Sequence, residues 1–400
     1  MGGPLAGYRI LDFTQFYQGP RGSGMLANMG AEVIKVERRI SGEPGRTFGR
    51  PAPDGFNNYI QALNHGKKSI TVDTRTDKGR EIIYKLVEKM DVVVENFRAG
   101  VMGRMGLGYD NLSRINPRLI YASGTAFGLK GGMTYWPGYD ICAEAMSGLM
   151  MANKESDGTP RIVGLGSTPF ADHLGGVFLA YGIVLALLAR ERSGIGQYLD
   201  VSLLGTMIET QPWAYCWRPG VDQPTSTGTG GRGRGTTYND FKCSDGKWVA
   251  VAAIGGPNLW PLLCQALGIE WVNQDPRFAD PRERFQHGQE LFEIVEKTFL
   301  SKPRDEWVRI FNEHDIPVAP VYEYAEAALH PQVTENQYIV TVDHPKWGKI
   351  QQVGLAVQLS KTPGDVHSFA PEVGEQTEEL LAEVGYTAQQ IAELREQEVI

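Results

Sequence analysis

The chain has 400 residues, of which 42% are hydrophobic and 22% are charged. A polypeptide of this length and composition buries a large core, which excludes wholesale disorder. Its formal net charge of −8 argues against general binding to the phosphate backbone of nucleic acids, although a small basic pocket for one anionic ligand stays compatible with it.

Strands and helices alternate along the first part of the chain. A short apolar strand at 8–13 leads into a helix that Gly19 and Pro20 open and Gly30 ends, and a second strand follows at 31–36. The pattern continues with a strand at 69–73, a helix at 77–89, and strands at 91–95 and 118–122. This alternation indicates an α/β fold whose parallel sheet is covered by helices on both faces.

The clearest predicted helix spans 168–193 and is followed by a strand at 197–201. Thr168 suits the N-cap, Pro169 suits the first helical position, and a glycine follows the basic end of the helix. Asp172 lies in the first turn, where the free N–H groups and the positive end of the helix dipole favour an ionised carboxylate. A dry, ionised carboxylate is a competent nucleophile, whereas an ordinary aspartate that complements the dipole is the alternative.

The composition changes near Pro219, where glycine, threonine and arginine become frequent. We predict a large domain at 1–218, a glycine-rich loop or linker at 219–236, a small domain at 237–325, and a C-terminal segment at 326–400 that returns to the large domain. The small domain contains an alternating strand at 247–253 and amphipathic helices to about 312. The C-terminal segment contains extended stretches at 338–343 and 348–357 and helices at about 374–384 and 388–397, the last with a capping box of Thr387 and Gln390.

The sequence gives little support to several common sites. The turn at 18–24 does not fit the dinucleotide fingerprint, no GxSxG elbow is present, and the seven histidines form no metal-binding motif. The four cysteines contain no CxxC pair, and the N-terminus lacks the features of a signal peptide. The longest apolar stretch, 174–189, is shorter than the roughly 18 residues that span a bilayer, so a buried helix is favoured. We expect a cytoplasmic protein with no membrane, metal or nucleic-acid partner.

Basic residues follow several of the predicted strands. Arg38 follows one strand and Arg98 another, and the carboxyl ends of parallel strands meet at one edge of the sheet. The two side chains are therefore candidates for holding a shared polyphosphate, although solvated surface charge is the alternative for most such residues.

Short motifs appear in a fixed order along nearly the whole chain, at 4–7, 11–12, 19–20, 30–37, 68–70, 91–98, 116–120, 138–140, 147–148, 171–172, 190–197 and 245–246. This series resembles the family III CoA-transferases, which include formyl-CoA transferase and carnitine CoA-transferase. The resemblance implies a Rossmann-like parallel-sheet large domain, a smaller α+β domain, and an interlocked homodimer.

The resemblance also implies that Asp172 is the catalytic residue. Its carboxylate would attack an acyl-CoA thioester to give an aspartyl anhydride, and the released thiolate would form an aspartyl-CoA thioester. An acceptor acid would then take the CoA through a second anhydride. Acyl-CoA and a carboxylic acid are the implied substrates, and no permanently bound cofactor is expected.

Further site residues follow from the same resemblance. The implied CoA contacts are Gln15, Phe16, Tyr17, Gln18, Arg38, Val72, Arg75, Asn96, Phe97, Arg98, Arg104, Tyr139 and Asp140. Gly230, Gly231 and Gly233 are implied to belong to a loop that shields the aspartate. Tyr17 stands where the formyl-CoA branch has glutamine, and Asp140 stands where it has glutamate, which argues against assuming formate and oxalate as substrates.

Two other functions stay open at this point. The α-methylacyl-CoA racemases share the fold and use a Gly-His-Asp motif, but this chain has Tyr139 in place of the histidine, and a tyrosine with a pKa near about 10 is a poor base at neutral pH. A transferase is therefore favoured. A non-catalytic CoA-binding protein is the third possibility, and the presence of Asp172 argues against it.

The acceptor acid is not determined by the sequence. Trp213, Tyr215 and Trp217 are candidates for a pocket that takes a bulky or aromatic acid, with core packing as the alternative. Arg232 and Arg234 are candidates for clamping a second carboxylate, as in succinate, with loop solubility as the alternative.

Overall fold

The computed structural model describes residues 2–48, 52–155, 157–164, 168–218, 220, 236–254 and 258–400. The chain divides into two compact units. The first comprises Met1–Leu149, Ile162–Pro224 and Thr334–Ile400, and the second comprises Met150–Arg161 and Thr225–Val333.

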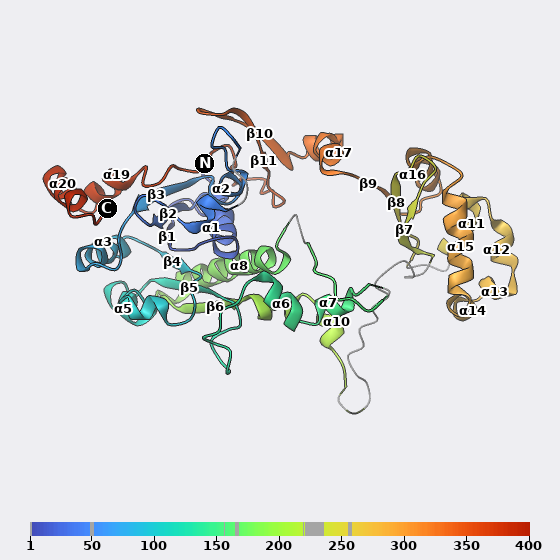
Figure 1. Ribbon diagram of the computed structural model, residues 1–400, viewed down its shortest axis with the longest axis horizontal. Coiled ribbons are helices and arrows are strands. Elements are labelled where there is room, and N and C mark those ends of the chain that lie inside the picture. Colours follow the sequence, from blue (N-terminus) through green and yellow to red (C-terminus); the bar gives the residue numbers. More distant parts are fainter. Residues whose placement is uncertain are drawn as a thin grey trace. The chain divides into compact units, whose positions relative to one another are not determined.

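A six-stranded parallel sheet forms the centre of the first unit (Figure 1). Its strands are β1 (Arg9–Asp12), β2 (Glu32–Glu37), β3 (Lys67–Thr71), β4 (Val92–Glu95), β5 (Ile120–Thr125) and β6 (Tyr198–Ser202). The strand order is β3-β2-β1-β4-β5-β6, and every neighbouring pair is parallel. This is the doubly wound order, which confirms the predicted Rossmann-like sheet and places its topological switch between β1 and β4.

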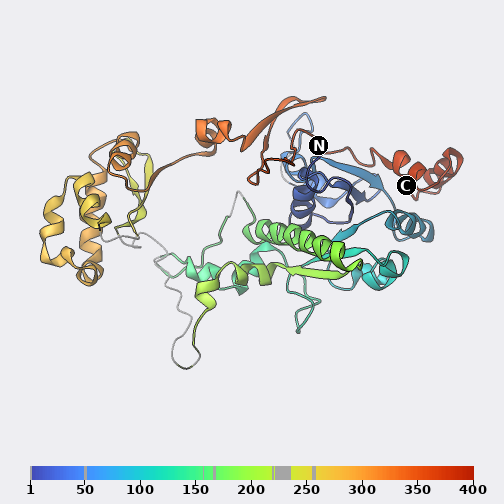
Figure 2. The same ribbon diagram turned by 180° about the vertical axis from the view of Figure 1, so that it is seen from behind.

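Successive residues of the central strands face opposite sides of the sheet, as the two-residue period of a strand requires. Ile10 and Val92 belong to the core formed with α1 (Gln18–Asn28) and α8 (Phe170–Ser193). Leu11 and Val93 belong to the opposite core, whose helices are α3 (Asp77–Val87), α5 (Tyr109–Ile115), α19 (Thr377–Glu383) and α20 (Ala388–Glu396). Two C-terminal helices therefore cover one face of the N-terminal sheet (Figure 2).

Shorter elements complete the first unit. They are η1 (Pro44–Thr47), α2 (Asn58–Asn64), α4 (Val101–Arg104), α6 (Asp140–Met146), α9 (Leu203–Glu209), α10 (Pro212–Tyr215), and the antiparallel strands β10 (Ile339–His344) and β11 (Gly348–Val353). Helix α7 (Leu149–Ala152) begins at the last residue of the first segment of this unit, and α18 (Pro331–Glu335) lies where its last segment begins.

The second unit combines a three-stranded antiparallel sheet with helices. Its strands are β7 (Tyr238–Lys242), β8 (Trp248–Ala252) and β9 (Val318–Val321), in the order β7-β8-β9. Its helices are α11 (Leu259–Leu267), α12 (Glu270–Gln274), α13 (Pro276–Ala279), α14 (Pro281–Gln286), α15 (Gly288–Phe299), α16 (Arg304–Glu313) and α17 (Tyr324–Leu329). Phe241, Phe299 and Trp307 lie at the centre of its core, as expected for a small α+β fold.

Three differences from the sequence predictions concern the start of α8, the end of β11 and the presence of β9. Pro169 has extended backbone and is the N-cap of α8, so the helix begins at Phe170 and Thr168 is not its cap. The C-terminal strand β11 ends at Val353, before the predicted end at 357, and at Gly354 the backbone passes too close to Gln337 O for a side chain to fit. Strand β9 was not predicted, since its proline breaks the usual strand pattern and suits only an edge strand.

Helix α8 carries Asp172 in its first turn. In the described part of the chain, α8 is the one helix that is long and apolar enough to cross a membrane. Of its most apolar stretch, 44% is buried inside the structure. Its buried side packs on α1 and the sheet through Leu179, Ile183 and Leu187. Glycines bring α1 and α8 into backbone contact: a Cβ on Gly176 would lie 2.7 Å from the carbonyl oxygen of Gln18.

Candidate active site

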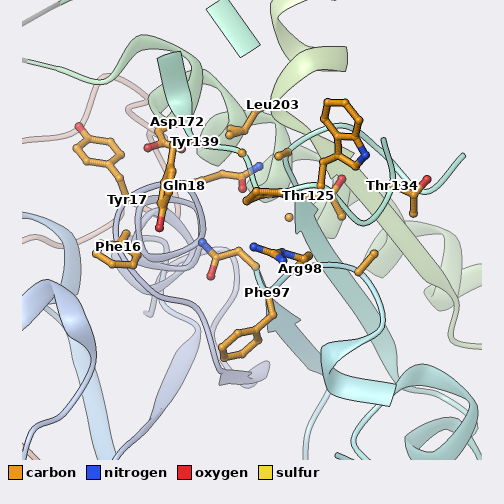
Figure 3. Close-up of a pocket in the computed structure, with 17 residues that line it drawn as sticks. Phe16, Tyr17, Gln18, Phe97, Arg98, Thr125, Thr134, Tyr139, Asp172 and Leu203 are labelled. Carbon is orange, nitrogen blue, oxygen red and sulfur yellow. The ribbon is translucent and has the colours of Figure 1, made fainter. Parts of the chain in front are cut away.

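A cavity of about 230 Å³ lies beside the first turn of α8 (Figure 3). It is formed at the carboxyl ends of β4 and β5, where parallel sheets bind ligands. Its lining residues are Phe16, Tyr17, Gln18, Asn96, Phe97, Arg98, Ala99, Gly124, Thr125, Ala126, Thr134, Trp136, Pro137, Gly138, Tyr139, Asp172 and Leu203. Many of the candidates named from the sequence therefore meet around one space.

Asp172 is the third residue of α8, and its backbone N–H donates a hydrogen bond of 2.9 Å to Oδ1 of Asp140. Burial, followed by the negative charge of Asp140, raises the pKa of Asp172 from 3.8 to about 7. The helix dipole contributes about 0.3–1 kcal/mol, which is less than one pKa unit, so it does not offset the burial. The expectation that Asp172 ionises easily at the helix terminus is therefore wrong.

The turn between β1 and α1 is fixed by hydrogen bonds to the side chains of Asn96 and Glu43. Asn96 Nδ2 donates to the carbonyl oxygen of Gln15 at 2.8 Å, and the Gln15 N–H donates to Asn96 Oδ1, also at 2.8 Å. Phe16 has a left-handed backbone with φ of 60°, and its N–H donates to Glu43 Oε2 at 2.9 Å. These bonds position Tyr17 and Gln18 in the wall of the cavity.

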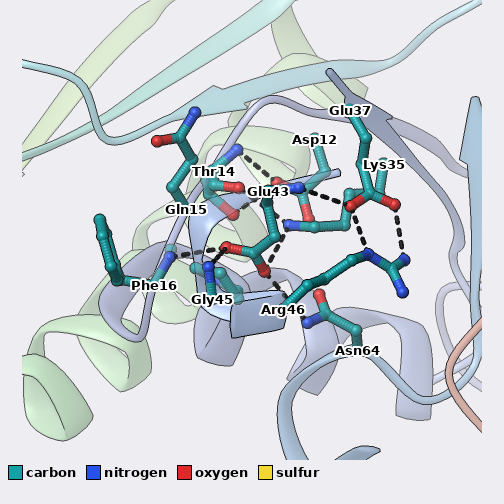
Figure 4. Close-up of polar contacts among 12 residues, drawn as sticks. Asp12, Thr14, Gln15, Phe16, Lys35, Glu37, Glu43, Gly45, Arg46 and Asn64 are labelled. Carbon is teal, nitrogen blue, oxygen red and sulfur yellow. Dashed lines mark hydrogen bonds and ion pairs between the residues drawn. The ribbon is translucent and has the colours of Figure 1, made fainter. Parts of the chain in front are cut away.

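A buried network of charged side chains supports the same turn (Figure 4). Lys35 Nζ donates to the carbonyl oxygen of Thr14 at 2.8 Å and lies 3.3 Å from Glu43 Oε1. Lys67 Nζ lies 3.0 Å from Asp12 Oδ2, and both residues are buried. Lys67 is therefore not a solvated surface charge, because its charge is paired inside the protein. Arg46 likewise pairs with Glu37, at 2.7 Å.

Aromatic side chains gather beside Asp172. The ring of Tyr17 lies 6.2 Å from the ring of Tyr59 and 6.2 Å from the imidazole of His173. The Tyr17 hydroxyl and Nδ1 of His173 are 3.4 Å apart. Burial and the positive charge of Arg21 lower the pKa of His173, which favours its neutral form. The sequence reasoning missed Arg21, Tyr59 and His173, because nothing in the spacing of a single sequence shows that these residues meet.

A second cavity, of about 780 Å³, lies at the carboxyl ends of β2 and β3. Five of the predicted CoA contacts line it, namely Gln15, Arg38, Val72, Arg75 and Phe97. Phe97 lines both cavities. The size of the second cavity suits a small-molecule ligand, because such sites commonly enclose roughly 300–1,000 Å³.

Several candidates are not brought together. Arg98 lines the first cavity and Arg38 the second, so the two do not share one cavity wall, and Arg104 lines neither cavity. Arg75 is 84% exposed and pairs with Asp73 at 2.8 Å. Asp140 contacts the backbone of Asp172 and is not a lining residue of the first cavity.

The glycines of the predicted shielding loop, Gly230, Gly231 and Gly233, lie outside the described residues, as do Arg232 and Arg234. Trp213 is 91% exposed, and Tyr215 and Trp217 are also exposed, so the core-packing interpretation of these aromatic residues is wrong. Within the described part of the chain, no group of three or more histidine, cysteine, aspartate or glutamate side chains is arranged to hold a metal ion.

The sequence profile of the family described as CoA-transferase family III matches residues 5–377. The chain belongs to this family. Among curated relatives, the acetyl-CoA:oxalate CoA-transferase of Acetobacter aceti is 35% identical over 359 residues, covering 90% of each chain. The succinyl-CoA:glutarate CoA-transferase of Mus musculus is 35% identical over 384 residues, covering 95% of this chain and 86% of the relative.

The solved structures agree with the family assignment. The crystal structure of a CAIB/BAIF family protein from Brucella suis matches with a TM-score of 0.84 and 30% identity, over 96% of this chain and all of that one. This family III CoA-transferase is thus an enzyme whose substrates include CoA thioesters. The racemase alternative is not favoured, because the relatives are named CoA-transferases and Tyr139 occupies the position of the racemase histidine.

Proposed function

We propose that this enzyme transfers CoA from an acyl-CoA thioester to a free carboxylic acid, with Asp172 as the nucleophile. The observation that carries the proposal is the carboxylate itself, which lines a cavity at the carboxyl edge of the sheet. Among the described residues, the charged neighbour that affects it is Asp140, and no cation pairs with it. A carboxylate without a cationic partner keeps its electron pair available for attack once it has lost its proton.

The proposed reaction has four steps that return Asp172 to its starting state. An Oδ atom of Asp172 attacks the thioester carbonyl carbon, the C–S bond breaks, and a mixed anhydride and the CoA thiolate form. The thiolate attacks the Asp172 acyl carbon and releases the donor acid. The acceptor carboxylate then attacks the aspartyl-CoA thioester and expels the thiolate, which finally attacks the acceptor's acyl carbon. Because anhydrides hydrolyse, the buried position of Asp172 is chemically necessary.

The two cavities suggest how CoA lies on the enzyme. The larger cavity has Arg38, which makes no ion pair among the described residues, and would take the phosphate-bearing end of CoA. The smaller cavity contains Asp172 and would take the thioester. Phe97, which lines both cavities, would contact the pantetheine arm between these ends.

The names of relatives suggest the class of acid. The proteins named above are assigned oxalate and glutarate, and a relative from Chloroflexus aurantiacus, 32% identical over 410 residues, is named the beta subunit of a succinyl-CoA:L-malate CoA-transferase. All of these acids carry two carboxyl groups. We therefore propose a dicarboxylic acid as donor or acceptor for this chain as well.

Trapping with hydroxylamine tests the nucleophile. The enzyme is incubated with acyl-CoA and hydroxylamine, and modified peptides are mapped by mass spectrometry while a panel of acids is tested for CoA exchange. We expect a hydroxamate on Asp172, and none on the Asp172→Asn variant. A modification on another carboxylate, with exchange intact, would contradict the assignment. Deuterium wash-in at the α-carbon without an acceptor acid would instead favour a racemase.

The homodimer and the cytoplasmic location remain parts of this proposal. The outer side of α8 exposes the apolar residues Tyr181, Val184, Leu185 and Leu188, which would be covered in a dimer. The four cysteines are free, as is usual in a reducing compartment. Sedimentation at micromolar concentration tests the dimer: a monomer there would contradict it.

A further inference from the structure

Arg21, on α1, is a half-buried cation that has no hydrogen-bond or ion-pair partner for its side chain among the described residues. Its Nε atom is buried and makes no hydrogen bond, and among the described residues its guanidinium forms no ion pair. Burial lowers the pKa of this guanidinium, which reflects the loss of water around the charge. A guanidinium that has lost part of its hydration without gaining an anion carries an uncompensated cost, which a carboxylate ligand would offset.

The position of Arg21 places it close to the reacting carboxylate. Its side chain packs on Gly176 of α8, where a Cβ on the glycine would lie 2.9 Å from the Arg21 Cβ. Gly176 is one helical turn beyond Asp172, and Tyr17 is one turn before Arg21 on α1. Tyr17 and Asp172 line the same cavity, so Arg21 lies one helical turn from one of its lining residues and packs one helical turn from the other.

Charge effects on Tyr17 give a second view of the same arrangement. The positive charge of Arg21 lowers the pKa of the Tyr17 hydroxyl, whereas the negative charge of Asp172 raises it, although burial is the largest effect. The charges of both Arg21 and Asp172 therefore act on the pKa of the Tyr17 hydroxyl. Arg21 also acts on the imidazole of His173, which lies 3.4 Å from the same hydroxyl. Among the described residues, no carboxylate acts on the pKa of Arg21 or forms an ion pair with it.

We propose that Arg21 binds the distal carboxylate of a dicarboxylic acid whose reacting carboxyl group lies at Asp172, with Tyr17 and His173 beside the chain between the two ends. This assignment rests on the proposed function and specifies its substrate class. A guanidinium holds a carboxylate through paired hydrogen bonds, so a short dicarboxylate satisfies the unpaired Arg21 and is oriented in the same step. A monocarboxylate of equal length leaves Arg21 without a partner.

The test compares acids of equal length with and without the second carboxylate. CoA exchange is measured with acetyl-CoA as donor and with succinate, glutarate, butyrate or valerate as acceptor, in the wild type and in Arg21→Met and Arg21→Lys. Loss of one charge-assisted pair is worth about 1.5–3 kcal/mol, so Arg21→Met should raise the KM for the dicarboxylates about 10- to 150-fold. The KM for the monocarboxylates and kcat should stay nearly unchanged. Arg21→Lys, which keeps the charge but loses the planar fork, should give an intermediate KM for dicarboxylates.

A matched control is Arg114→Met, which removes an exposed arginine on α5 and should change neither KM. The ratio of the two KM values is independent of the fraction of folded enzyme, so partial unfolding of a variant does not mimic the result. An equal rise for both kinds of acid, or no rise, would overturn the role of Arg21 while leaving the transferase intact. Failure of the wild type to exchange CoA with any acid would instead overturn the proposed function.

Discussion

The backbone N–H of Asp172 donates a hydrogen bond of 2.9 Å to Oδ1 of Asp140. The Asp140 carboxylate thus accepts a hydrogen bond from a free N–H group in the first turn of α8, the helix that carries Asp172. The same contact brings two negative charges close together, and this adds to the effect of burial on the pKa of Asp172. Asp140 therefore acts on Asp172, the proposed nucleophile, through its position and its charge.

The pH dependence of the reaction should report this arrangement. Since Asp172 must lose a proton before it attacks, and its pKa is raised to about 7, kcat/KM for acyl-CoA should rise with pH through about 7 and then level off. In Asp140→Asn the amide oxygen still accepts the N–H bond but the negative charge is gone. The midpoint should move down by roughly half a unit to one unit. Asp110→Asn, in the first turn of α5, serves as control and should leave the midpoint in place.

The stability of the Asp172→Asn variant should depend on pH with a defined sign. Between about pH 4 and pH 7 the folded chain keeps a proton that the unfolded chain releases, so the wild type loses stability as pH rises through this window. Asparagine carries no charge and has no such loss. The variant should therefore melt above the wild type at pH 8, by on the order of 2 kcal/mol in stability, with a smaller gain at pH 5. A thermal melt at both pH values checks this, and a lower melting temperature at pH 8 would contradict it.

The reciprocal hydrogen bonds between Asn96 and Gln15 should connect stability to CoA binding. Asn96→Asp removes the donor to the Gln15 carbonyl and places a negative charge beside it, so we expect a loss of about 1–3 kcal/mol and a several-fold higher KM for acyl-CoA. Asn116→Asp is the matched control, because Asn116 also donates to backbone carbonyls, of Val87 and Met90, but lines neither cavity. It should lower stability without changing the KM. Equal KM changes in both variants would refute a specific role of Asn96.

Two neighbouring lysines offer a test of the buried network. Lys67 is fully buried and bonds to Asp12, Ser23 and Asn64, so Lys67→Met leaves a buried carboxylate short of a partner. We expect a loss of about 3–5 kcal/mol. Lys68 pairs with Glu32 and Glu379 at the surface, and Lys68→Met should cost less than about 1 kcal/mol. Hydrogen exchange of the β1 and β3 amides measures both variants, and similar protection in the two would rule out this explanation.

Much of the large unit could be predicted from the sequence. The central strands β1, β2 and β4 have largely apolar, largely buried residues, most clearly the three valines of β4, and such runs identify strands that are covered on both faces. The capping box of Thr387 and Gln390 is present as predicted, because its signal lies within four consecutive residues. Asp172 was found for the same reason, since its place in a helical turn is a local property.

The remainder of the site depends on residues that are far apart in sequence. Arg21, Tyr59 and His173 come from three helices, and only the packing of α1, α2 and α8 brings them to Tyr17. The raised pKa of Asp172 could not be predicted from the sequence either, because burial is set by the whole fold and outweighs the effect of the helix dipole. The burial of Lys67 could not be predicted either, since a lysine beside a strand is usually solvated.

Because α1 and α8 meet through glycine backbone, the position of Asp172 does not depend on the side chains that would select the acid. The spacing of the two helices is set by main-chain atoms at Gly22 and Gly176, where a Cβ on Gly22 would lie 2.9 Å from the Gly176 carbonyl oxygen. Side chains beside the proposed acid site, such as Tyr17 and His173, can therefore be exchanged without moving Asp172, the proposed nucleophile. A descendant of this sequence can therefore change its choice of acid by ordinary point substitutions, while the chemistry it performs stays the same.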